Sequence, residues 1–176
     1  MSEFFSAPFR YPWKEAPFLT KLFRLFYKRV KRTGAGVIIY YTFPKQNTKI
    51  LLLHRLPPWN DWTFPKGGLE PGEKDVRLVA IREGIEETGL SFKIKKTLSI
   101  NNYAFYNDEK RELVYRTVHY FLALAKNTDV DLKKNPDKKE ATSIDKYKWV
   151  HIPEAIKLVK HENEKDTLRK AQEFLK

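Results

Sequence analysis

The spacing of hydrophobic residues changes several times along this chain, and each change predicts the start or end of a strand or helix. Two nearly continuous apolar runs, AGVIIYYTF at 35–43 and KILLLHR at 49–55, predict buried strands. The stretch LPPWNDWTFPKGG at 56–68 predicts a loop rich in proline and tryptophan. Helical spacing then begins near Asp75, and Gly89 is placed to end that helix.

The second half of the chain continues the alternation. Strand-like segments cover 91–100, 112–125 and 147–152, and a helix is predicted over 153–175. The pair Asn107 and Asp108 predicts a turn between the first two of these strands. Because strands and helices interleave, the pattern predicts an α/β domain built in layers rather than a helical bundle or a β-sandwich.

The N-terminal residues have a different character. Residues 1–17 are rich in proline and aromatic side chains, which favours an extended arm. Residues 18–32 place apolar side chains at helical spacing with lysines and arginines on the other faces, which predicts an amphipathic helix. We therefore expect a basic, aromatic arm and helix at 1–33 and the main domain at 34–176.

Length, cysteine content and charge narrow the function. A chain of 176 residues suits one domain with a sizeable core. It contains no cysteine, so disulfides and cysteine nucleophiles are excluded, and any metal must bind oxygen or imidazole ligands. No apolar run approaches the roughly 18 residues that a membrane-spanning helix needs, and we expect a cytoplasmic protein. The net charge of +12, half of it in residues 1–32, predicts anionic partners such as nucleotides, polyphosphates, RNA or a lipid surface.

Three glutamates crowd the helix predicted after Asp75. Glu83, Glu86 and Glu87 lie at positions i, i+3 and i+4, on one face, where like charges repel by a few tenths of a kcal/mol per pair. Their place in the later half of the helix adds an unfavourable dipole interaction. A solvated acidic face is the alternative, but the clustering favours a bound cation. Mg²⁺ or Mn²⁺ fits best, because these hard ions accept carboxylates and leave places for water and phosphate oxygens.

The segment before this helix contains three glycines that would let the backbone approach a metal or a phosphate. Taken together, FPKGGLEPGEKDVRLVAIREGIEETGL resembles the box motif of the Nudix hydrolases, which reads Gly, five residues, Glu, seven residues, Arg-Glu-(apolar)-x-Glu-Glu-x-Gly-(apolar). Gly67 and Glu73 match at the correct spacing, and the residues from Arg82 to Leu90 match the second half. Two departures stand out: eight residues rather than seven separate Glu73 from Arg82, and Gly84 replaces an apolar residue.

This resemblance implies an α/β/α sandwich with a mixed β-sheet, and hydrolysis of a nucleoside diphosphate linked to another moiety with Mg²⁺ or Mn²⁺ as cofactor. By their positions in the motif, four residues would supply metal ligands: Gly67 through its carbonyl, Glu83, Glu86 (directly or through water) and Glu87. Arg82 would orient these carboxylates, and Glu73 would hold Arg82. Such a site activates a water for in-line attack on phosphorus.

Parts of the chain outside the box favour one branch of the family. WTFPKG before the box, TVHYFLA at 117–123 and the ending at 149–175 resemble the asymmetrical diadenosine tetraphosphate hydrolases, over roughly residues 34–175. This implies cleavage of dinucleoside polyphosphates to ATP and AMP. WTFPKGG also resembles bacterial RNA pyrophosphohydrolases, so removal of pyrophosphate from an RNA 5′ end is an alternative. A nucleotide or RNA binding module without turnover is the alternative of a different class.

Several residues outside the glutamate helix are candidates for catalysis or substrate binding. Glu140, in the polar loop before the last strand, is the first candidate for general base, and Asp145 is the second. Lys66 is expected to contact phosphate and Tyr120 to contact the adenine. Other aromatic residues that could stack on a base are Trp59, Trp62, Tyr103 and Tyr106. The histidines have no spacing typical of a metal site and are expected to be structural or exposed: His54, His119, His151 and His161.

The predicted helix at 18–32 has three interpretations. Its apolar stripe packs on the main domain or on a second subunit, it lies on an anionic membrane as a peripheral contact, or it binds an RNA backbone. The sequence leaves these alternatives and the oligomeric state open.

Overall fold

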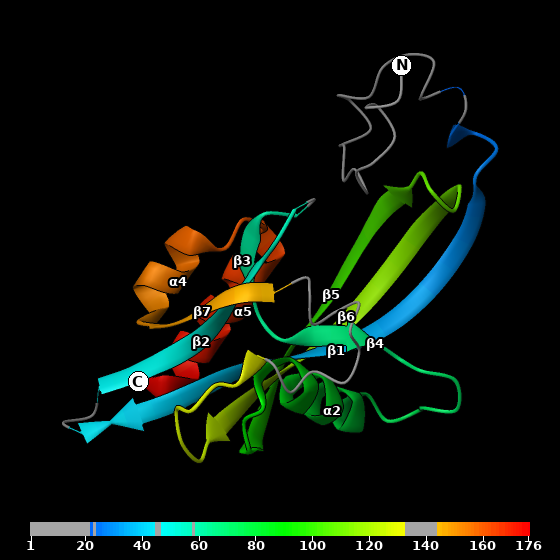
Figure 1. Ribbon diagram of the computed structural model, residues 1–176. Helices are drawn as coiled ribbons and strands as arrows, with labels where there is room; N and C mark the ends of the chain where they lie inside the picture. Colours follow the sequence, from blue (N-terminus) through cyan, green and yellow to red (C-terminus); the bar gives the residue numbers. More distant parts are fainter. Residues whose placement is uncertain (1–21, 23, 45–46, 58, 133–143) are drawn as a thin grey trace. The chain divides into compact units, whose positions relative to one another are not determined.

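The computed structural model describes residues 22, 24–44, 47–57, 59–132 and 144–176 (Figure 1). The chain divides into two compact units. The hairpin unit comprises Met1–Thr33 and Asn102–Thr117, and the main unit comprises Gly34–Asn101 and Val118–Lys176. Three long strands contribute residues to both units: β1 (Lys28–Phe43), β5 (Phe92–Asn107) and β6 (Glu112–Ala125).

The sheet has the strand order β3-β2-β1-β6-β5, with β4 paired to β1 and β7 paired to β2. Its shorter strands are β2 (Asn47–Arg55), β3 (Asp61–Thr63), β4 (Lys66–Gly68) and β7 (Ile144–Val150). β2 is antiparallel to β1, to β3 and to β7, whereas the arrows of β1 and β6 run the same way in Figure 1. The sheet is therefore mixed, as the resemblance to the Nudix hydrolases implies.

Both faces of this sheet are covered by helices, which explains why the first two strands are apolar at almost every position. Val37 and Leu51 belong to a core cluster with Val79 and Ala80 of α2 (Val76–Thr88). Side chains alternate along a strand, so Ile38 faces the opposite way. That second side holds α4 (Ile152–Leu158) and α5 (Glu162–Leu175) (Figure 1). The layered α/β architecture is confirmed.

Helix α2 begins and ends where the sequence predicts. The Asp75 carboxylate accepts a hydrogen bond from the Arg77 backbone N–H at 2.8 Å, which caps the first turn. Gly89 ends the helix with a φ of 68°, and its N–H donates to the Ile85 carbonyl at 2.7 Å.

The glycine at position 84 has a packing role. A Cβ at Gly84 would lie 2.5 Å from Phe92 Cζ and 2.8 Å from Val37 Cγ1. The absence of a side chain lets α2 approach the sheet closely. This contact offsets the roughly 1 kcal/mol of helix propensity that glycine loses relative to alanine.

The helix predicted over 18–32 is wrong for residues 28–32, which form the first part of β1. The Lys28 N–H donates to the Arg111 carbonyl at 3.0 Å. Pairing with a residue far along the chain satisfies the backbone, so tertiary structure overrides the local helical spacing. The predicted arm at 1–17 lies outside the described residues.

The C-terminal helical segment also differs from its prediction. The helix expected at 153–175 is two helices, α4 and α5, because the chain is extended at Val159 with φ −71° and ψ 137°. The strand expected at 147–152 ends at Val150, and Ile152 already begins α4. Within the described part of the chain, no helix is long and apolar enough to cross a membrane.

Candidate active site

A tight turn leads from β4 into the glutamate helix. The Glu73 N–H donates to the Glu70 carbonyl at 3.0 Å, with Pro71 and Gly72 between them. Gly72 has a φ of 93°, and proline followed by glycine at these two positions is typical of a type II turn. The Glu70 N–H also donates to Glu73 Oε2 at 2.7 Å, so the turn itself fixes the Glu73 carboxylate.

Arg82 connects this turn to the helix. Its Nε and Nη2 donate to the two carboxylate oxygens of Glu73 at 2.9 and 3.0 Å, and Nη2 also donates to the Gly68 carbonyl at 3.0 Å. The hydrogen bonds from Arg82, and then the one from the Glu70 N–H, lower the pKa of Glu73. The extra residue between Glu73 and Arg82 thus does not keep the two side chains apart.

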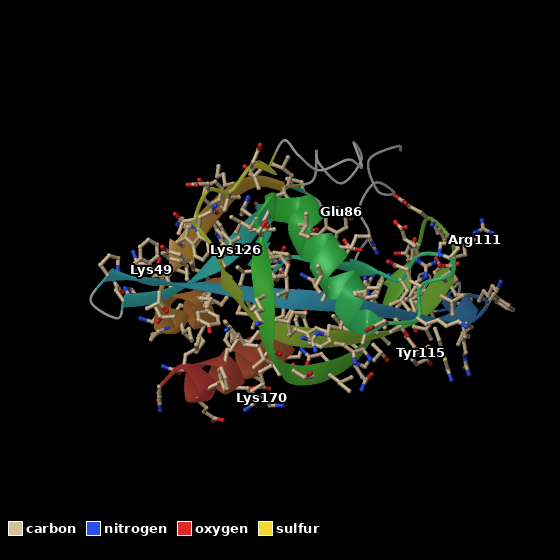
Figure 2. All side chains as sticks on the ribbon, turned by 90° about the horizontal axis from the view of Figure 1, so that it is seen from below. Lys49, Glu86, Arg111, Tyr115, Lys126 and Lys170 are labelled. Atoms are coloured by element: carbon tan, nitrogen blue, oxygen red, sulfur yellow. The ribbon has the colours of Figure 1, made fainter. Side chains whose placement is uncertain are left out.

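The same guanidinium contacts the helix glutamates. Arg82 Nη1 lies 2.9 Å from Glu86 Oε2 and 3.0 Å from Glu83 Oε1, and it is 3.7 Å from a carboxylate oxygen of Glu70. The hydrogen bond to Glu73 raises the pKa of Arg82 first, and the charges of Glu83 and Glu86 add to this, so the arginine stays protonated. Glu86 lies on α2 (Figure 2).

Glu83 and Gly67 approach each other closely. Glu83 is buried, with 3% of its surface exposed. A Cβ at Gly67 would lie only 1.9 Å from Glu83 Oε1 and 2.2 Å from Oε2. The carboxylate therefore occupies the space that any other residue at position 67 would fill. Gly67 pairs with Ala35 of β1 in the sheet, and this pairing fixes the position of the Gly67 backbone.

Glu87, one helical turn after Glu83, contacts the same strand. The Lys66 backbone N–H donates to Glu87 Oε2 at 3.0 Å. Strand β4 and helix α2 are therefore connected three times: through Glu87, through Glu83 against Gly67, and through Arg82 at the Gly68 carbonyl. The structure brings together the box residues that the sequence singled out. Their roles as metal ligands stay predictions.

The charges at this site do not balance. Arg82 supplies one positive charge against the carboxylates of Glu70, Glu73, Glu83 and Glu86, so these five side chains together carry −3. Excess negative charge on oxygen donors fits a hard divalent cation such as Mg²⁺ or Mn²⁺. Among the described residues, as the side chains stand, no three acidic or histidine groups converge on a metal position. Glu83 and Glu86 are instead directed at Arg82.

The Lys66 side chain points into a buried polar cluster with Thr63 and Glu164 rather than toward the glutamates of α2. Its Nζ donates to Thr63 Oγ1 and lies 3.4 Å from Glu164 Oε1. Thr63 Oγ1 donates to the same Glu164 oxygen at 3.0 Å, and both residues are buried. The predicted contact between Lys66 and phosphate stays a prediction that would require this side chain to leave the cluster.

Tyr120 lies at the edge of this cluster. Its ring is 2% exposed and packs edge-on against Phe64 at 6.0 Å between centroids. Its hydroxyl is 3.5 Å from Glu164 Oε1. The predicted contact of Tyr120 with substrate stays a prediction, and in this conformation the ring is packed in the core. Sequence reasoning missed Glu164, because its partner Thr63 is 101 positions away and no spacing along the chain connects the two residues.

The structure describes one of the two candidates for general base, Asp145. Glu140 lies outside the described residues. Asp145, on β7, has Oδ1 2.5 Å from His54 Nδ1, and Lys146 contacts its other oxygen at 3.3 Å. The hydrogen bond with His54 is the main cause of the lowered pKa of Asp145. His54 also lies against the Trp62 ring, with 5.1 Å between centroids.

A third buried carboxylate, after Glu83 and Glu164, lies on β3: that of Asp61, two residues before Thr63. Arg55 donates to both oxygens of Asp61 at 2.8 and 2.7 Å, and His161 Nε2 is 3.7 Å from Asp61 Oδ2. Burial alone would raise the pKa of Asp61, but hydrogen bonds with His161 and Arg55 hold it well below its usual value. The Arg55 guanidinium also lies over the Trp59 ring at 5.2 Å.

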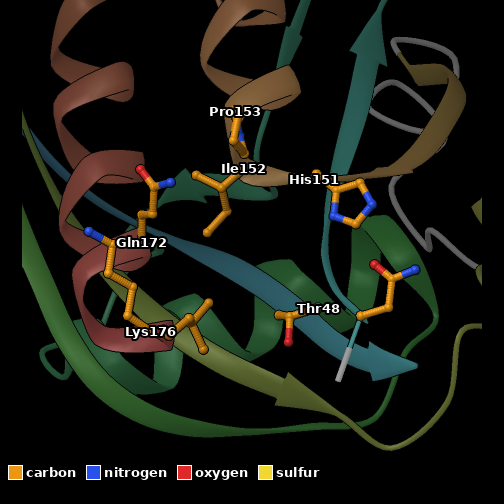
Figure 3. Close-up of a pocket in the computed structure, with 8 residues that line it drawn as sticks. Thr48, His151, Ile152, Pro153, Gln172 and Lys176 are labelled. Atoms are coloured by element: carbon orange, nitrogen blue, oxygen red, sulfur yellow. The ribbon is translucent and has the colours of Figure 1, made fainter. Parts of the chain in front are cut away.

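A pocket of about 270 Å³ lies elsewhere in the main unit (Figure 3). Its walls come from the start of β2, the start of α4 and the end of α5, and include Thr48, Ile152 and Gln172. None of the box residues lines this pocket. This pocket is therefore separate from the carboxylates around Arg82.

Comparisons with known proteins show which proteins this chain is similar to. A model of the NUDIX domain matches residues 30–171. The bis(5′-nucleosyl)-tetraphosphatase (asymmetrical) of Rattus norvegicus is 33% identical to this chain, over 81% of this chain and 94% of its own length. The enzyme of the same name from Caenorhabditis elegans is 31% identical, over 81% of this chain and 95% of its own length.

A solved structure shows the same arrangement of the chain. The crystal structure of a C. elegans Ap4A hydrolase binary complex superposes with a TM-score of 0.65 at 29% identity, covering 82% of this chain and 97% of that chain. The RNA pyrophosphohydrolase of Caulobacter vibrioides is 37% identical, but over only 34% of this chain and 33% of its own length.

Proposed function

This chain belongs to the Nudix hydrolase family, and from that premise we propose that it hydrolyses dinucleoside polyphosphates such as diadenosine tetraphosphate to ATP and AMP with Mg²⁺ or Mn²⁺. That it is a Nudix pyrophosphohydrolase follows from its relatives. The proposal adds the substrate, the metal and the products. Similarity to asymmetrical tetraphosphatases over most of both chains supports this substrate over RNA, for which the similarity is confined to a short segment.

One observation supports the metal site above the others: four carboxylates share a single arginine beside a strand that has no side chain at Gly67. A cluster that repels itself in this way is stabilised by a multivalent cation. In our proposal Glu83, Glu86 and Glu87 hold the ion together with the Gly67 carbonyl. When bound, such an ion neutralises phosphate oxygens and lowers the pKa of a coordinated water.

The remaining residues of the box position these groups. Arg82 holds Glu83 and Glu86 by hydrogen bonds and ion pairs, and Glu73 holds Arg82 through two hydrogen bonds. Because each carboxylate is already held in place, less conformational entropy is lost when substrate binds. The Lys66 N–H restricts Glu87 in the same way. The proton acceptor in our proposal is Glu140, with Asp145 as the second candidate.

A substrate comparison tests this proposal. Purified full-length protein is incubated in Mg²⁺ buffer with diadenosine tetraphosphate and, separately, with 5′-triphosphorylated RNA, and the products are separated by chromatography. We expect ATP and AMP from the dinucleotide, with RNA processed much more slowly. Running the reaction in water labelled with heavy oxygen shows which product receives the oxygen of water, and therefore which phosphorus is attacked.

Two outcomes would contradict the proposal. Release of pyrophosphate or phosphate from RNA, with the dinucleotide left intact, would assign the enzyme to RNA 5′ ends. Binding of both ligands without any product would favour a binding module. A titration with EDTA and re-addition of Mg²⁺ or Mn²⁺ separates loss of metal from loss of fold, because a folded apoenzyme regains activity when the metal returns.

A further inference from the structure

The hairpin unit contains two exposed apolar residues held between two anchors. Arg24 Nε and Nη2 donate to the two carboxylate oxygens of Asp108 at 3.2 and 2.9 Å, and the Tyr27 hydroxyl donates to Asp108 Oδ1 at 3.0 Å. Between these anchors, Leu25 is 67% exposed and Phe26 is 84% exposed. Both flanking residues bind the same carboxylate, so the two apolar side chains are held outward.

The two anchors, Arg24 and Tyr27, make packed contacts that hold this segment in place. Arg24 is 4% exposed, and its guanidinium lies 4.4 Å from the centre of the Tyr106 ring. The Tyr27 ring packs edge-on against Tyr106 at 6.0 Å. A charged, two-point hydrogen bond of this kind and a cation over an aromatic ring fix both ends of the segment. The exposure of Leu25 and Phe26 is therefore a stable feature of this unit.

Positive charge surrounds this segment. The Lys28 N–H donates to the Arg111 carbonyl at 3.0 Å, which brings the start of β1 beside the turn between β5 and β6. The described residues of the hairpin unit carry eight basic and three acidic side chains, a net charge of +5. Six of the cations are exposed at or next to the turn and the start of β1: Lys28, Arg29, Lys31, Arg32, Lys110 and Arg111.

The turn holds one of these cations in a backbone conformation that suits glycine better. Arg111 has a φ of 51°, in the left-handed region, and Figure 2 labels it at the turn. The Lys110 N–H donates to Asn107 Oδ1 at 3.1 Å, which stabilises the turn locally. A non-glycine residue with this φ is unfavourable for folding. An arginine at this position is explained if its charge contacts a binding partner.

We propose that this hairpin tip, residues 24–31 and 107–111, docks on an anionic lipid surface. Leu25 and Phe26 enter the interfacial layer while the surrounding lysines and arginines contact acidic headgroups. An RNA backbone would use the positive charge but leave Leu25 unburied, and two of the rings that could stack on bases, Tyr27 and Tyr106, already pack on each other. This proposal stands on the hairpin unit and does not depend on the substrate proposed above.

Vesicle sedimentation with the full chain tests the proposal. The vesicles are phosphatidylcholine alone, and phosphatidylcholine mixed with phosphatidylserine. We expect binding only to the acidic vesicles, weakened by added salt. Replacing Lys110 and Arg111 by glutamine should reduce binding about 30-fold, from about 1 kcal/mol per charge. Leu25→Ser with Phe26→Ser should reduce it about 10-fold or more, because two apolar side chains no longer leave water.

Two matched controls distinguish the tip from the rest of the surface. Ile100→Ser with Phe174→Ser removes two exposed apolar side chains of the main unit, and Lys126→Gln with Lys160→Gln removes two of its exposed charges. Neither control should change vesicle binding by more than about twofold. Arg111→Gly should lower vesicle binding while the melting temperature stays the same or rises, since glycine relieves the positive φ.

Three outcomes would overturn the proposal: equal binding to neutral and acidic vesicles, equal losses in the tip and control variants, or no vesicle binding at all. Single-stranded RNA is tested in parallel. RNA binding that depends on Lys110 and Arg111 but is unchanged by Leu25→Ser with Phe26→Ser, without vesicle binding, would assign the tip to nucleic acid. Circular dichroism and thermal unfolding confirm that each variant is folded.

Discussion

Two charged clusters meet at strand β4, and they differ in how their charges balance. On one side, Arg82 faces an excess of carboxylates and is connected to Gly68 and, through Glu73, to the preceding turn. On the other, the ammonium of Lys66 contacts Thr63 and the carboxylate of Glu164, and its charge also acts on Asp61. The first cluster is partly exposed, whereas Thr63 and Glu164 are 3% and 4% exposed.

This difference separates a cluster held by its own ion pair from one whose excess negative charge fits a cation. In the buried cluster the ammonium and the carboxylate pair and both contact Thr63, although Glu164 Oε2 has no hydrogen-bond partner among the described residues. A partly exposed group of like charges is satisfied only in part by one guanidinium, and the remainder can be met by a cation. Lys66 belongs to both clusters, since its backbone N–H binds Glu87 while its side chain binds Glu164.

The sharpest test of the comparison is Glu87→Gln. The amide keeps an oxygen for the Lys66 N–H but removes a negative charge from the acidic cluster. We expect kcat/KM for diadenosine tetraphosphate to fall by about two to three orders of magnitude, the range for losing one group that stabilises transition-state charge. The free energy of unfolding without metal should not fall, because repulsion among the carboxylates decreases. Measurable turnover close to that of the wild type would refute the role of Glu87.

For Asp61→Asn we expect the opposite of Glu87→Gln: lower stability with nearly unchanged activity. Asp61 is 7% exposed and binds Arg55 through two hydrogen bonds, so its loss leaves a buried guanidinium without its counter-charge. We expect the free energy of unfolding to fall by about 3 kcal/mol. Urea unfolding measures this change, and kcat/KM measured well below the melting temperature should stay within about threefold of the wild type.

Asp61 also predicts how stability depends on pH. Its pKa in the folded protein is lower than in the unfolded chain, so its stabilising contribution is complete above about pH 5 and is lost as the pH falls toward the folded value. The acid side of the stability profile should therefore be flatter in Asp61→Asn than in the wild type. Parallel profiles below pH 5 would show that this ion pair does not contribute to acid unfolding.

A pair of glycine variants separates the site from the packing behind it. In Gly67→Ala the new Cβ meets the Glu83 carboxylate, and in Gly84→Ala it meets Phe92 and Val37. Overpacking costs about 1–3 kcal/mol, so Gly84→Ala should lower the free energy of unfolding with kcat nearly unchanged. Gly67→Ala should lower kcat/KM about tenfold or more by displacing Glu83. Equal effects of both variants on activity would contradict a specific role for the Gly67 contact.

The sequence predicted one of these clusters and not the other, for a physical reason. The acidic site is local: helical spacing places the three glutamates on one face, and the resemblance to the Nudix box adds Gly67, Glu73 and Arg82 from the adjoining strand, turn and helix. Glu164 and Thr63 come together only when α5 packs on the sheet. The same limit explains the wrong helix at 28–32, where pairing with the distant turn at Arg111 decides the conformation.

The smallest expected effect comes from Glu164→Gln, and it tests whether the buried cluster is only structural. The amide keeps the size of the side chain and an acceptor for Thr63, but Lys66 loses its counter-charge. One carboxylate oxygen of Glu164, Oε2, has no hydrogen-bond partner among the described residues. The negative charge of Glu164 is therefore only partly stabilised in the folded protein, and removing it has a small effect. We expect the free energy of unfolding to fall by about 1 kcal/mol.

Activity decides the interpretation of that variant. The Lys66 N–H still binds Glu87 in Glu164→Gln, so kcat/KM should change by less than about threefold. Lys66→Met is the matched variant, because it removes the ammonium and leaves the backbone N–H. A large loss of activity in both variants, with stability unchanged, would mean that the ammonium reaches the substrate phosphate. The two clusters at β4 would then form one active site rather than a reactive half and a structural half.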